Sequence, residues 1–264
     1  MNPSRLGEHG ATSQPFTARL TFHGDLAFFL KQAETEQTIL RTLNEKTSVK
    51  DAIESCGVPH PEVDLILVEG VPVDFSCALQ RNTTIEVYPV GFTHTAAPHE
   101  RSPRDDIKRF IADGHLGKLT RNLRLLGFDV AYLSAAEDRQ LLETMQRENR
   151  ALLTRDRRLL MHAVVQHGYY PRSQEATEQT IEVVRRFELF SSIAPFTRCL
   201  HCNALLQEVE KAEVIEQLEP LTRIYYNQFR RCTGCGQIYW RGSHFSKLEA
   251  RLQQIRAQCL GRAS

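Results

Sequence analysis

Two pairs of cysteines in the last third of the chain have the spacing of metal ligands. The first pair lies in CLHC (residues 199–202) and the second in CTGC (residues 232–235), with 29 residues between them. Two such pairs match a closed zinc ribbon, in which each pair supplies two thiolates to one tetrahedral ion. We therefore predict a structural Zn²⁺ bound by Cys199, Cys202, Cys232 and Cys235.

Two unlinked redox pairs are the alternative interpretation of these motifs. That alternative does not explain why Gly234 and Gly236 surround the second pair, where the backbone would turn tightly toward a metal. His201 and His244 are further possible ligands, but four thiolates already complete the coordination sphere. Because no position is left open, the site is expected to stabilise folding rather than to catalyse.

Three aspartates form a second group of residues that could perform chemistry. Asp113 directly follows the apolar run FIA, Asp156 follows ALLT after one arginine, and Asp138 begins a predicted helix. Ligands of parallel sheets gather beyond the carboxyl ends of the strands, so these side chains are expected at one edge. Three carboxylates repel one another unless a cation neutralises them, and oxygen ligands suit Mg²⁺ or Mn²⁺.

Phosphodiester hydrolysis is the reaction that such a group of carboxylates commonly serves. Two metals roughly 4 Å apart can activate a water molecule and stabilise the leaving oxygen. Any one aspartate after a strand can instead be a helix N-cap or a turn residue, and that alternative stays open. Glu137, beside Asp138, is a less favoured ligand, and Arg155, Arg157 and Arg158 beside Asp156 favour an anionic substrate.

Basic and aromatic side chains near these motifs are candidate RNA contacts. Lys118, Arg121 and Arg124 lie off the leucine stripe of a predicted helix and could bind phosphates or form a solvated face. Tyr239 and Trp240 could stack on unpaired bases, or could close a ribbon that has little core. The predicted substrate-binding residues are therefore Lys118, Arg121, Arg124, Arg155, Arg157, Tyr239 and Trp240.

The elements that position the aspartates alternate between strand and helix. Their order is βαβαβα, with strands at 109–112, 128–133 and 150–154 and helices at 115–126, 138–149 and 176–189. This order predicts a parallel sheet covered by helices, in a domain over residues 106–195. The zinc ribbon is expected at 196–245, and a basic amphipathic helix packed on the body at 246–264.

A separate domain is predicted over residues 17–92. Four strand-like segments and one short helix follow the order ββαββ, with the strands at 18–22, 37–43, 64–69 and 84–90. The helix, 48–57, has Ser48 as its predicted N-cap and ends at Gly57. This order resembles the ubiquitin-like β-grasp, particularly its sulfur-carrier branch. Sulfur carriers end in a free Gly-Gly tail, whereas this chain continues past Gly91, which favours docking to a protein partner or a structural role.

Composition and charge place the chain among soluble multidomain proteins. Residues 1–98 hold 7 Lys+Arg against 12 Asp+Glu, and residues 99–264 hold 26 against 20. The basic part favours a polyanionic partner, although a solvated surface would give the same balance. No apolar run approaches the ~20 residues of a membrane span.

The segments outside the predicted domains have no expected fold. Residues 1–16 are interpreted as a disordered leader of a cytoplasmic protein, and residues 93–105 as a linker. The remaining cysteines, Cys56, Cys77 and Cys259, are interpreted as free or buried thiols.

The stretches FIADGHLGKLTRNLRLLGFDVAYL and LLTRDRRLL, with Asp138 and the cysteine region, resemble a known family. It is the mutator-seven C-terminal RNase domain family, a group of PIN-like nucleases often preceded by a ubiquitin-like domain. The resemblance spans residues 18 to 245 and implies a PIN-like fold, cleavage of single-stranded RNA, and Asp113, Asp138 and Asp156 as metal ligands. PIN nucleases generally have four acids at the site, and the sequence assigns only three.

The predicted fold class is therefore α/β and α+β multidomain: a ubiquitin-like β-grasp, a PIN-like parallel-sheet nuclease domain and a zinc ribbon. The favoured function is a metal-dependent ribonuclease. A non-catalytic RNA-binding adaptor that uses the zinc ribbon and the ubiquitin-like domain is the alternative, and sulfur transfer would require the terminal Gly-Gly that the chain lacks.

Overall fold

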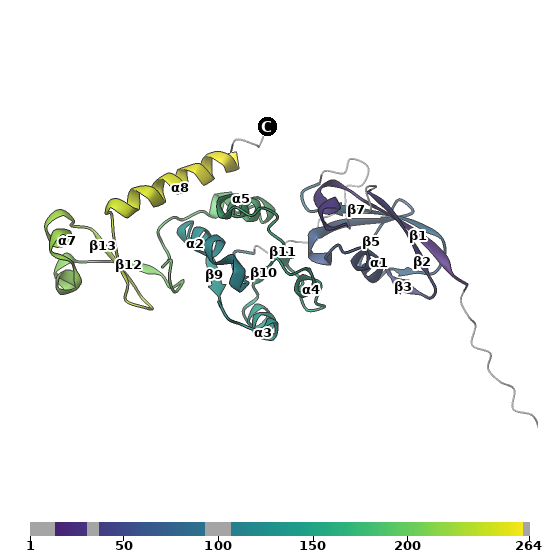
Figure 1. Cartoon of the computed structure of the whole chain (residues 1–264), viewed down its shortest axis with the longest axis horizontal. Helices are drawn as coiled ribbons and strands as arrows, with labels where there is room; N and C mark the ends of the chain where they lie inside the picture. Colours follow the sequence, from purple (N-terminus) through teal and green to yellow (C-terminus); the bar gives the residue numbers. More distant parts are fainter. Residues whose placement is uncertain (1–13, 31–36, 93–106, 261–264) are drawn as a thin grey trace, which may run out of the picture. The chain divides into compact units, whose positions relative to one another are not determined.

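The computed structural model describes residues 14–30, 37–92 and 107–260, and the chain divides into two compact units, Met1–Arg101 and Ser102–Ser264 (Figure 1). The predicted leader lies largely, and the predicted linker wholly, outside the described residues. The side chains of His244 and Cys259 also lie outside them. Within the described ranges, no helix combines the length and apolar character that crossing a bilayer requires.

The N-terminal unit is built on a five-stranded mixed sheet. Its strands stand in the order β2-β1-β7-β4-β5, and the central pair β1 and β7 is parallel while the other pairs are antiparallel. Their bounds are β1 Phe16–Phe22, β2 Thr38–Leu43, β4 Val63–Val68, β5 Val71–Val73 and β7 Thr83–Pro89. This arrangement, with one helix, confirms the predicted ubiquitin-like β-grasp.

Helix α1 (Val49–Ser55) begins where the sequence predicted. The Ser48 hydroxyl accepts a hydrogen bond from the backbone N–H of Asp51, at 3.0 Å, as an N-cap does. Val49, Ala52 and Ile53 turn its apolar face inward and are buried. The short elements were not predicted: strand β5, η1 (Gly24–Phe29), η2 (His60–Glu62), and the two-residue strands β3 (Thr47–Ser48) and β6 (Ala78–Leu79), of which β3 and β6 pair with each other.

The C-terminal unit contains a four-stranded sheet in which every pair is parallel. Its order is β11-β10-β8-β9, with bounds β8 Arg109–Ala112, β9 Asp129–Tyr132, β10 Ala151–Leu153 and β11 Gly168–Tyr169. From β8 the chain passes to β9 on one side and then crosses to β10 on the other. The order therefore reverses between β8 and β10, which creates the kind of switch point where open parallel sheets bind ligands.

Helices cover both faces of this sheet. Figure 1 shows α2 (Gly117–Leu125) and α5 (Ala176–Arg186) on one side of the strands and α3 (Asp138–Glu148) on the other. Phe110, Val130 and Leu153 of the sheet form one core with Leu119 and Leu123 of α2. Helix α8 (Ser243–Leu260) adds buried Leu252 and Ile255 to this core, so it packs on the body as predicted.

The predicted single helix over 115–126 is divided, which corrects the sequence prediction. A 3-10 turn, η3 (Gly114–Leu116), precedes α2. Close packing explains why positions 114 and 117 are glycines. A Cβ at Gly114 would lie 2.8 Å from the Ser134 carbonyl oxygen, and one at Gly117 would lie 2.8 Å from the Tyr132 hydroxyl. The short β11, α4 (Arg157–Leu160) and η4 (Leu189–Ser192) were also not predicted.

The cysteine region forms a three-stranded antiparallel sheet. Its strands are β12 (Leu206–Val209), β13 (Phe229–Cys232) and β14 (Ile238–Trp240). The connection from β12 to β13 holds three short helices that sequence reasoning did not address: α6 (Lys211–Val214), η5 (Ile215–Gln217) and α7 (Pro220–Tyr225). Val214 and Leu218 of this connection pack on Phe229 and Ile238, so the insertion supplies half of the small core.

We expect Gly127→Ala to destabilise the C-terminal unit by about 3 kcal/mol or more, because strain and a clash combine there. Gly127 ends α2 at φ +97°, and a Cβ would lie 2.2 Å from the Ala194 carbonyl oxygen. Gly236→Ala is the matched control, since its φ is +73° and its Cβ would meet open space; it should cost about 1 kcal/mol. Denaturant unfolding followed by fluorescence of Trp240, the single tryptophan, measures both, and equal losses would contradict the packing argument.

Candidate carboxylate site and metal centre

Asp113 lies at the switch point, directly after β8. Its backbone N–H donates to the Leu153 carbonyl at 3.0 Å, which extends the β8–β10 pairing by one residue. The Thr154 hydroxyl donates to Oδ2 of Asp113 at 2.8 Å, and the backbone N–H of His115 donates to Oδ1 at 3.1 Å. The carboxylate is therefore fixed from both sides while remaining half-buried.

Asp156 is joined to the same cluster through Thr154. The Thr154 side chain is fully buried, and its hydroxyl oxygen accepts from the backbone N–H of Asp156 at 2.9 Å. Oδ1 of the exposed Asp156 accepts from the N–H groups of Arg158 (2.7 Å) and Leu159 (3.2 Å), as the N-cap of α4. One hydroxyl thus connects two aspartates across neighbouring strands, and each aspartate also caps a helix.

Asp138 follows β9, the strand that pairs with β8 on the edge opposite to β10. It is the exposed first residue of α3, which follows β9, and Glu137 is the N-cap of that helix. Among the residues that the structure describes, only the four cysteines bring three or more potential ligand atoms within 4.8 Å of one another. The three aspartates do not form so compact a cluster, and the role of Asp138 as a ligand stays a prediction.

Two of the predicted RNA-binding arginines flank an aromatic ring beside this site. The guanidinium carbons of Arg155 and Arg157 lie 5.7 and 6.0 Å from the centre of the Tyr170 ring. Arg155 also donates to the side chain of Gln174 at 2.6 Å. Because Tyr170 directly follows β11, the positive charge lies at the carboxyl edge of the sheet.

The basic residues of α2 divide into two groups. Lys118 and Arg121 are exposed, which suits contact with a phosphate. Arg124 is only 4% exposed and donates to the carbonyls of Val130, Leu200 and His201, at 2.7 to 3.2 Å. The expectation that Arg124 contacts RNA does not fit this burial: its guanidinium instead ties the parallel-sheet domain to the first cysteine pair.

The four cysteines have the geometry of a tetrahedral thiolate site. All four sulfurs lie within 4.8 Å of one another, with 3.7 Å from Cys199 to Cys235 and 3.2 Å from Cys202 to Cys232. Metal–sulfur bonds of about 2.3 Å at tetrahedral angles would separate the sulfurs by about 3.8 Å. Backbone N–H groups also point at the sulfurs, at 3.4 to 3.5 Å, so the donor set fits Zn²⁺.

The sulfurs perturb one another strongly when no cation is present. Burial raises the pKa of the Cys199 thiol, but hydrogen bonds from the Cys202 N–H and the Tyr239 hydroxyl outweigh it and lower the pKa to about 6. The Gln237 N–H lowers the pKa of Cys235, yet burial and the other three sulfurs raise it to about 12. Four thiolates in this space would repel one another, and a structural metal could neutralise their charge.

The Tyr239 hydroxyl belongs to this cysteine site, although the residue also lines the groove beside it. Its hydroxyl lies 3.1 Å from the Cys199 sulfur and accepts from the Leu200 N–H at 3.2 Å. Burial, with the Cys199 thiolate, raises its pKa. This half-buried position supports the alternative in which Tyr239 closes the ribbon. Trp240 is 38% exposed and lines an open groove, so it remains available to a ligand.

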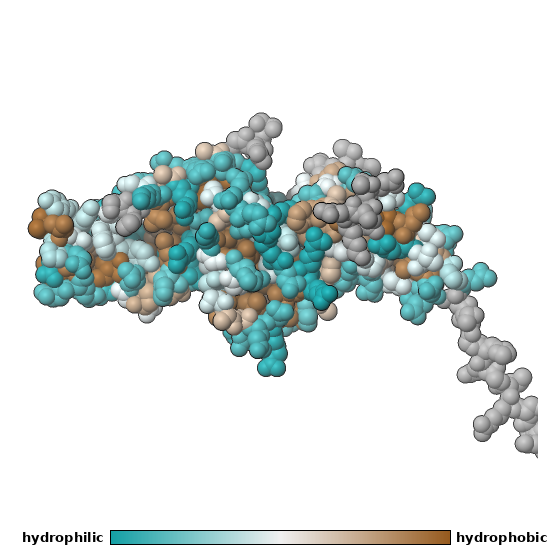
Figure 2. Space-filling view, viewed as in Figure 1, coloured by the Kyte–Doolittle hydropathy of each residue, from teal (hydrophilic) through white to brown (hydrophobic). Residues whose placement is uncertain are grey.

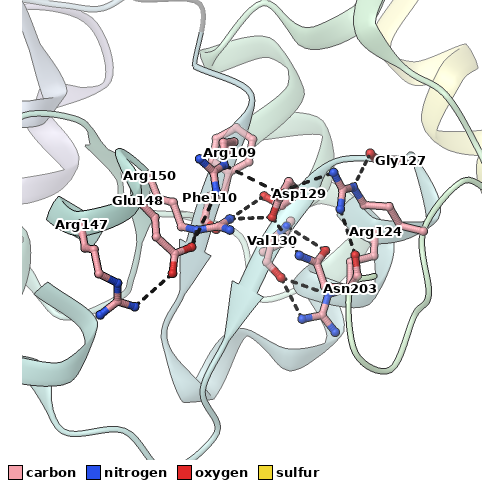
Figure 3. Close-up of polar contacts among 11 residues, drawn as sticks. Arg109, Phe110, Arg124, Gly127, Asp129, Val130, Arg147, Glu148, Arg150 and Asn203 are labelled. Atoms are coloured by element: carbon pink, nitrogen blue, oxygen red, sulfur yellow. Dashed lines mark hydrogen bonds and ion pairs between the residues drawn. The ribbon is translucent and has the colours of Figure 1, made fainter. Parts of the chain in front are cut away.

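The carboxylate of Asp129, at the start of β9, connects the sheet to the cysteine site (Figure 3). Arg150 donates to it at 2.6 Å and Asn203 at 2.8 Å, and Arg198 lies at 3.5 Å. Burial raises the pKa of Asp129, but the hydrogen bonds from Arg150 and Asn203 and the charges of Arg150 and Arg198 outweigh it and lower the pKa below its usual value. Asn203, at φ +73°, follows the first cysteine pair directly and also accepts from the Val130 N–H at 3.0 Å.

Sequence reasoning missed four residues of this arrangement. Thr154 could have been found, because it is the one hydroxyl-bearing residue between the apolar strand and Asp156 in LLTRD. Tyr170, Asp129 and Asn203 carry no local signal, since their importance comes from contacts between distant segments.

These features define a two-part protein: a ubiquitin-like domain, and a parallel-sheet domain with a carboxylate edge and a four-cysteine site. The chain belongs to the Mut7-C RNAse domain family, whose pattern matches residues 108–252. Residues 16–94 match the domain described as Mut7-C ubiquitin, so the family resemblance drawn from the motifs is confirmed. A comparison with curated proteins found no match.

We expect the purified protein to hold one Zn²⁺ per chain and Cys232→Ser to lose it, because Cys232 is one of the four sulfurs that complete the site. Metal analysis by mass spectrometry measures this content. Cys77→Ser, at a half-buried cysteine of the other unit, is the matched control and should keep the metal. Full retention of Zn²⁺ by Cys232→Ser would contradict the assignment.

We expect Asp129→Asn to lower the stability of the C-terminal unit by about 2 kcal/mol at pH 7, since it removes one of the two carboxylates that are paired with the buried Arg150. Because the pKa of Asp129 is lower in the folded protein than in the unfolded chain, its charge adds stability at pH values above the unfolded pKa of about 3.9. This stability is lost as the pH falls through the folded pKa. The difference between wild type and variant should therefore shrink below pH 4 in denaturant titrations. Glu143→Gln, an exposed residue paired with Arg139 at 3.3 Å, should cost under about 0.5 kcal/mol at either pH.

Proposed function

We propose that this protein is a metal-dependent ribonuclease with a PIN-like catalytic domain, which hydrolyses phosphodiester bonds of single-stranded or structured RNA. The observation that carries the proposal is the Asp113–Thr154–Asp156 cluster at the switch point of the parallel sheet. Membership of an RNase domain family supports the reaction type.

The carboxylates have the right chemistry to hold Mg²⁺ or Mn²⁺. Mg²⁺ usually keeps several water ligands and is held by one or two carboxylates together with substrate phosphates, so a compact three-acid cluster is not required. Asp113 and Asp156 supply this pair, and each carboxylate oxygen retains acceptor capacity beyond the hydrogen bond it already makes. Asp138, at the start of the helix after β9, is the proposed third ligand.

When bound, the divalent metal supplies an activated water and stabilises charge on the leaving oxygen. The protein holds the two carboxylates rigidly, because Thr154 and the helix N-terminal N–H groups fix their oxygens. Lys118, Arg121, Arg155 and Arg157 neutralise RNA phosphates around the edge, and the exposed Trp240 offers a stacking surface for an unpaired base.

The other parts of the chain have supporting roles in this proposal. The four cysteines bind structural Zn²⁺, which fixes the segment that Arg124 and Asn203 join to the sheet. The ubiquitin-like domain binds a protein partner, and the protein acts in the cytoplasm.

Asp113→Asn combined with Asp156→Asn should reduce metal-dependent RNA cleavage by at least about 100-fold without unfolding the protein. Asparagine keeps a side-chain oxygen and is as good an N-cap as aspartate, so η3 and α4 should persist. Cleavage of a labelled, partly structured RNA is measured with EDTA, Mg²⁺ or Mn²⁺, and RNA affinity is measured on the same samples.

Two single variants sharpen this experiment. Asp138→Asn tests the third ligand, and Glu143→Gln is a matched control on the exposed side of the same helix that should cut at the wild-type rate. Retained RNA affinity without cutting would assign the loss to chemistry. If the wild type binds RNA but cuts in no condition, the protein is an RNA-binding adaptor and the ribonuclease proposal is wrong.

A further inference from the structure

Strand β2 forms one edge of the sheet in the N-terminal unit. Among the described residues it pairs with β1 and with no other strand. The backbone N–H of Phe22 donates to the carbonyl of Gln37, which lies opposite it, at 2.8 Å. Hydrogen-bonded pairs alternate along an antiparallel ladder, so every second residue of β2 faces away from β1. Thr38, Leu40 and Thr42 therefore direct their N–H and C=O groups toward the free side.

The free side of β2 is open to another strand. In the part of the chain that the structure describes, no backbone hydrogen bond reaches Thr38, Leu40 or Thr42 from that side. Leu40 is 58% exposed, and Figure 2 shows hydrophobic residues at the surface of this unit, near the place where Figure 1 labels β1 and β2. A row of unpaired N–H and C=O groups is a template for strand addition, because an extended backbone presents donors and acceptors at the same spacing.

The other edge of the same sheet is closed to strand addition. Strand β5 is three residues long, and its central residue, Pro72, has no N–H. Val68 and Val71 flank a two-residue turn and form the hydrogen-bonded pair next to it, so Pro72 faces the free edge. Strand β2 contains no proline and no lysine, and its register against β1 is continuous. The sheet thus has one protected edge and one open edge.

The sequence of β2 is complementary to itself in one antiparallel register. With a two-fold axis at Leu40, this residue lies opposite Leu40 of a second copy, Thr38 lies opposite Thr42, and Ile39 lies opposite Arg41. All three outward-facing residues of each copy are then paired. An axis at Ile39 would leave Thr42 without a partner in β2, and an axis at Arg41 would place two arginines directly opposite each other.

The charges on the two strands are compatible with this register. Arg41 is the charged residue of β2, and Arg19, beside Leu40, is that of β1. With the axis at Leu40 the two Arg41 residues are diagonal neighbours, about 7–8 Å apart between their Cα atoms. The two Arg19 residues lie one strand further from the axis. Salt screens charges over about 8 Å at physiological ionic strength, so we expect association to strengthen as salt is added.

We propose that β2 is a self-association surface, through which two copies of this protein join their N-terminal sheets in antiparallel fashion around Leu40. The occupant of the open edge is therefore β2 of a second copy. Two six-residue strands bury less than the roughly 1,600 Å² of a standard interface, so the dimer is reversible. This inference is independent of the ribonuclease proposal, because β2 and the proposed catalytic aspartates belong to different units.

Sedimentation velocity of the full-length protein over a concentration series tests the proposal. The wild type should pass from monomer to dimer as its concentration rises. Leu40→Lys should raise the dissociation constant at least about tenfold, since it places like charges opposite each other at the axis and removes the Leu40 contact. Val71→Lys, at a 61% exposed residue of the protected edge, is the matched control and should associate as the wild type does. Circular dichroism checks that both variants are folded.

A mixing experiment tests the register. Leu40→Glu should also be monomeric alone, but an equimolar mixture of Leu40→Glu and Leu40→Lys should form a heterodimer, because opposite charges then meet at the axis. Under mild oxidation Leu40→Cys should form a disulfide with its own copy, and Val71→Cys should not.

A wild type that stays monomeric at the highest concentration would overturn the proposal. Association that is unchanged in Leu40→Lys, a mixture that stays monomeric, or equal crosslinking of the two cysteine variants would overturn it as well. None of these results depends on RNA cleavage, so the ribonuclease proposal stands or fails separately.

Discussion

The partly buried carboxylate of Asp129 is the constraint on which the C-terminal unit depends. It lies where β9 begins, and it receives Arg150 from the segment entering β10 and Asn203 and Arg198 from the cysteine region. A charge in this position is stable only with such partners. One side chain therefore fixes the amino-terminal edge of the sheet and the attachment of the ribbon together, and Arg124 reinforces that attachment from α2.

The opposite edge of the sheet holds the proposed catalytic aspartates, Asp113 and Asp156. The ribbon is attached beside the beginning of β9, whereas the strand order reverses between the carboxyl ends of β8 and β10. The two aspartates there are held by short-range bonds from Thr154 and from helix N–H groups rather than by cationic side chains. These hydrogen bonds orient the carboxylates and leave their charge available to a metal. The charge of Asp129, in contrast, is neutralised by arginines.

The ribbon insertion has two sides that its sequence does not distinguish. The strands and the insertion's inner residues make a core small enough to need a structural metal, since Val214, Leu218, Phe229 and Ile238 are its principal buried members. The insertion's outer residues contribute nothing to that core. A single segment thus stabilises the ribbon on one side and exposes apolar side chains on the other.

Local patterns in the sequence determined the cysteine site, the ubiquitin-like domain and the alternation of strand and helix, because spacing, capping and periodicity act over a few residues. They also placed Asp113 and Asp156 after strands. Only the tertiary structure decided that β8 lies beside β10, so that Thr154 joins these aspartates, while Asp138 follows β9, the strand on the other edge of β8. It likewise decided that Arg124 and Tyr239 are structural and that α7 exposes Leu221, because burial depends on which distant segments meet, and no local pattern encodes that.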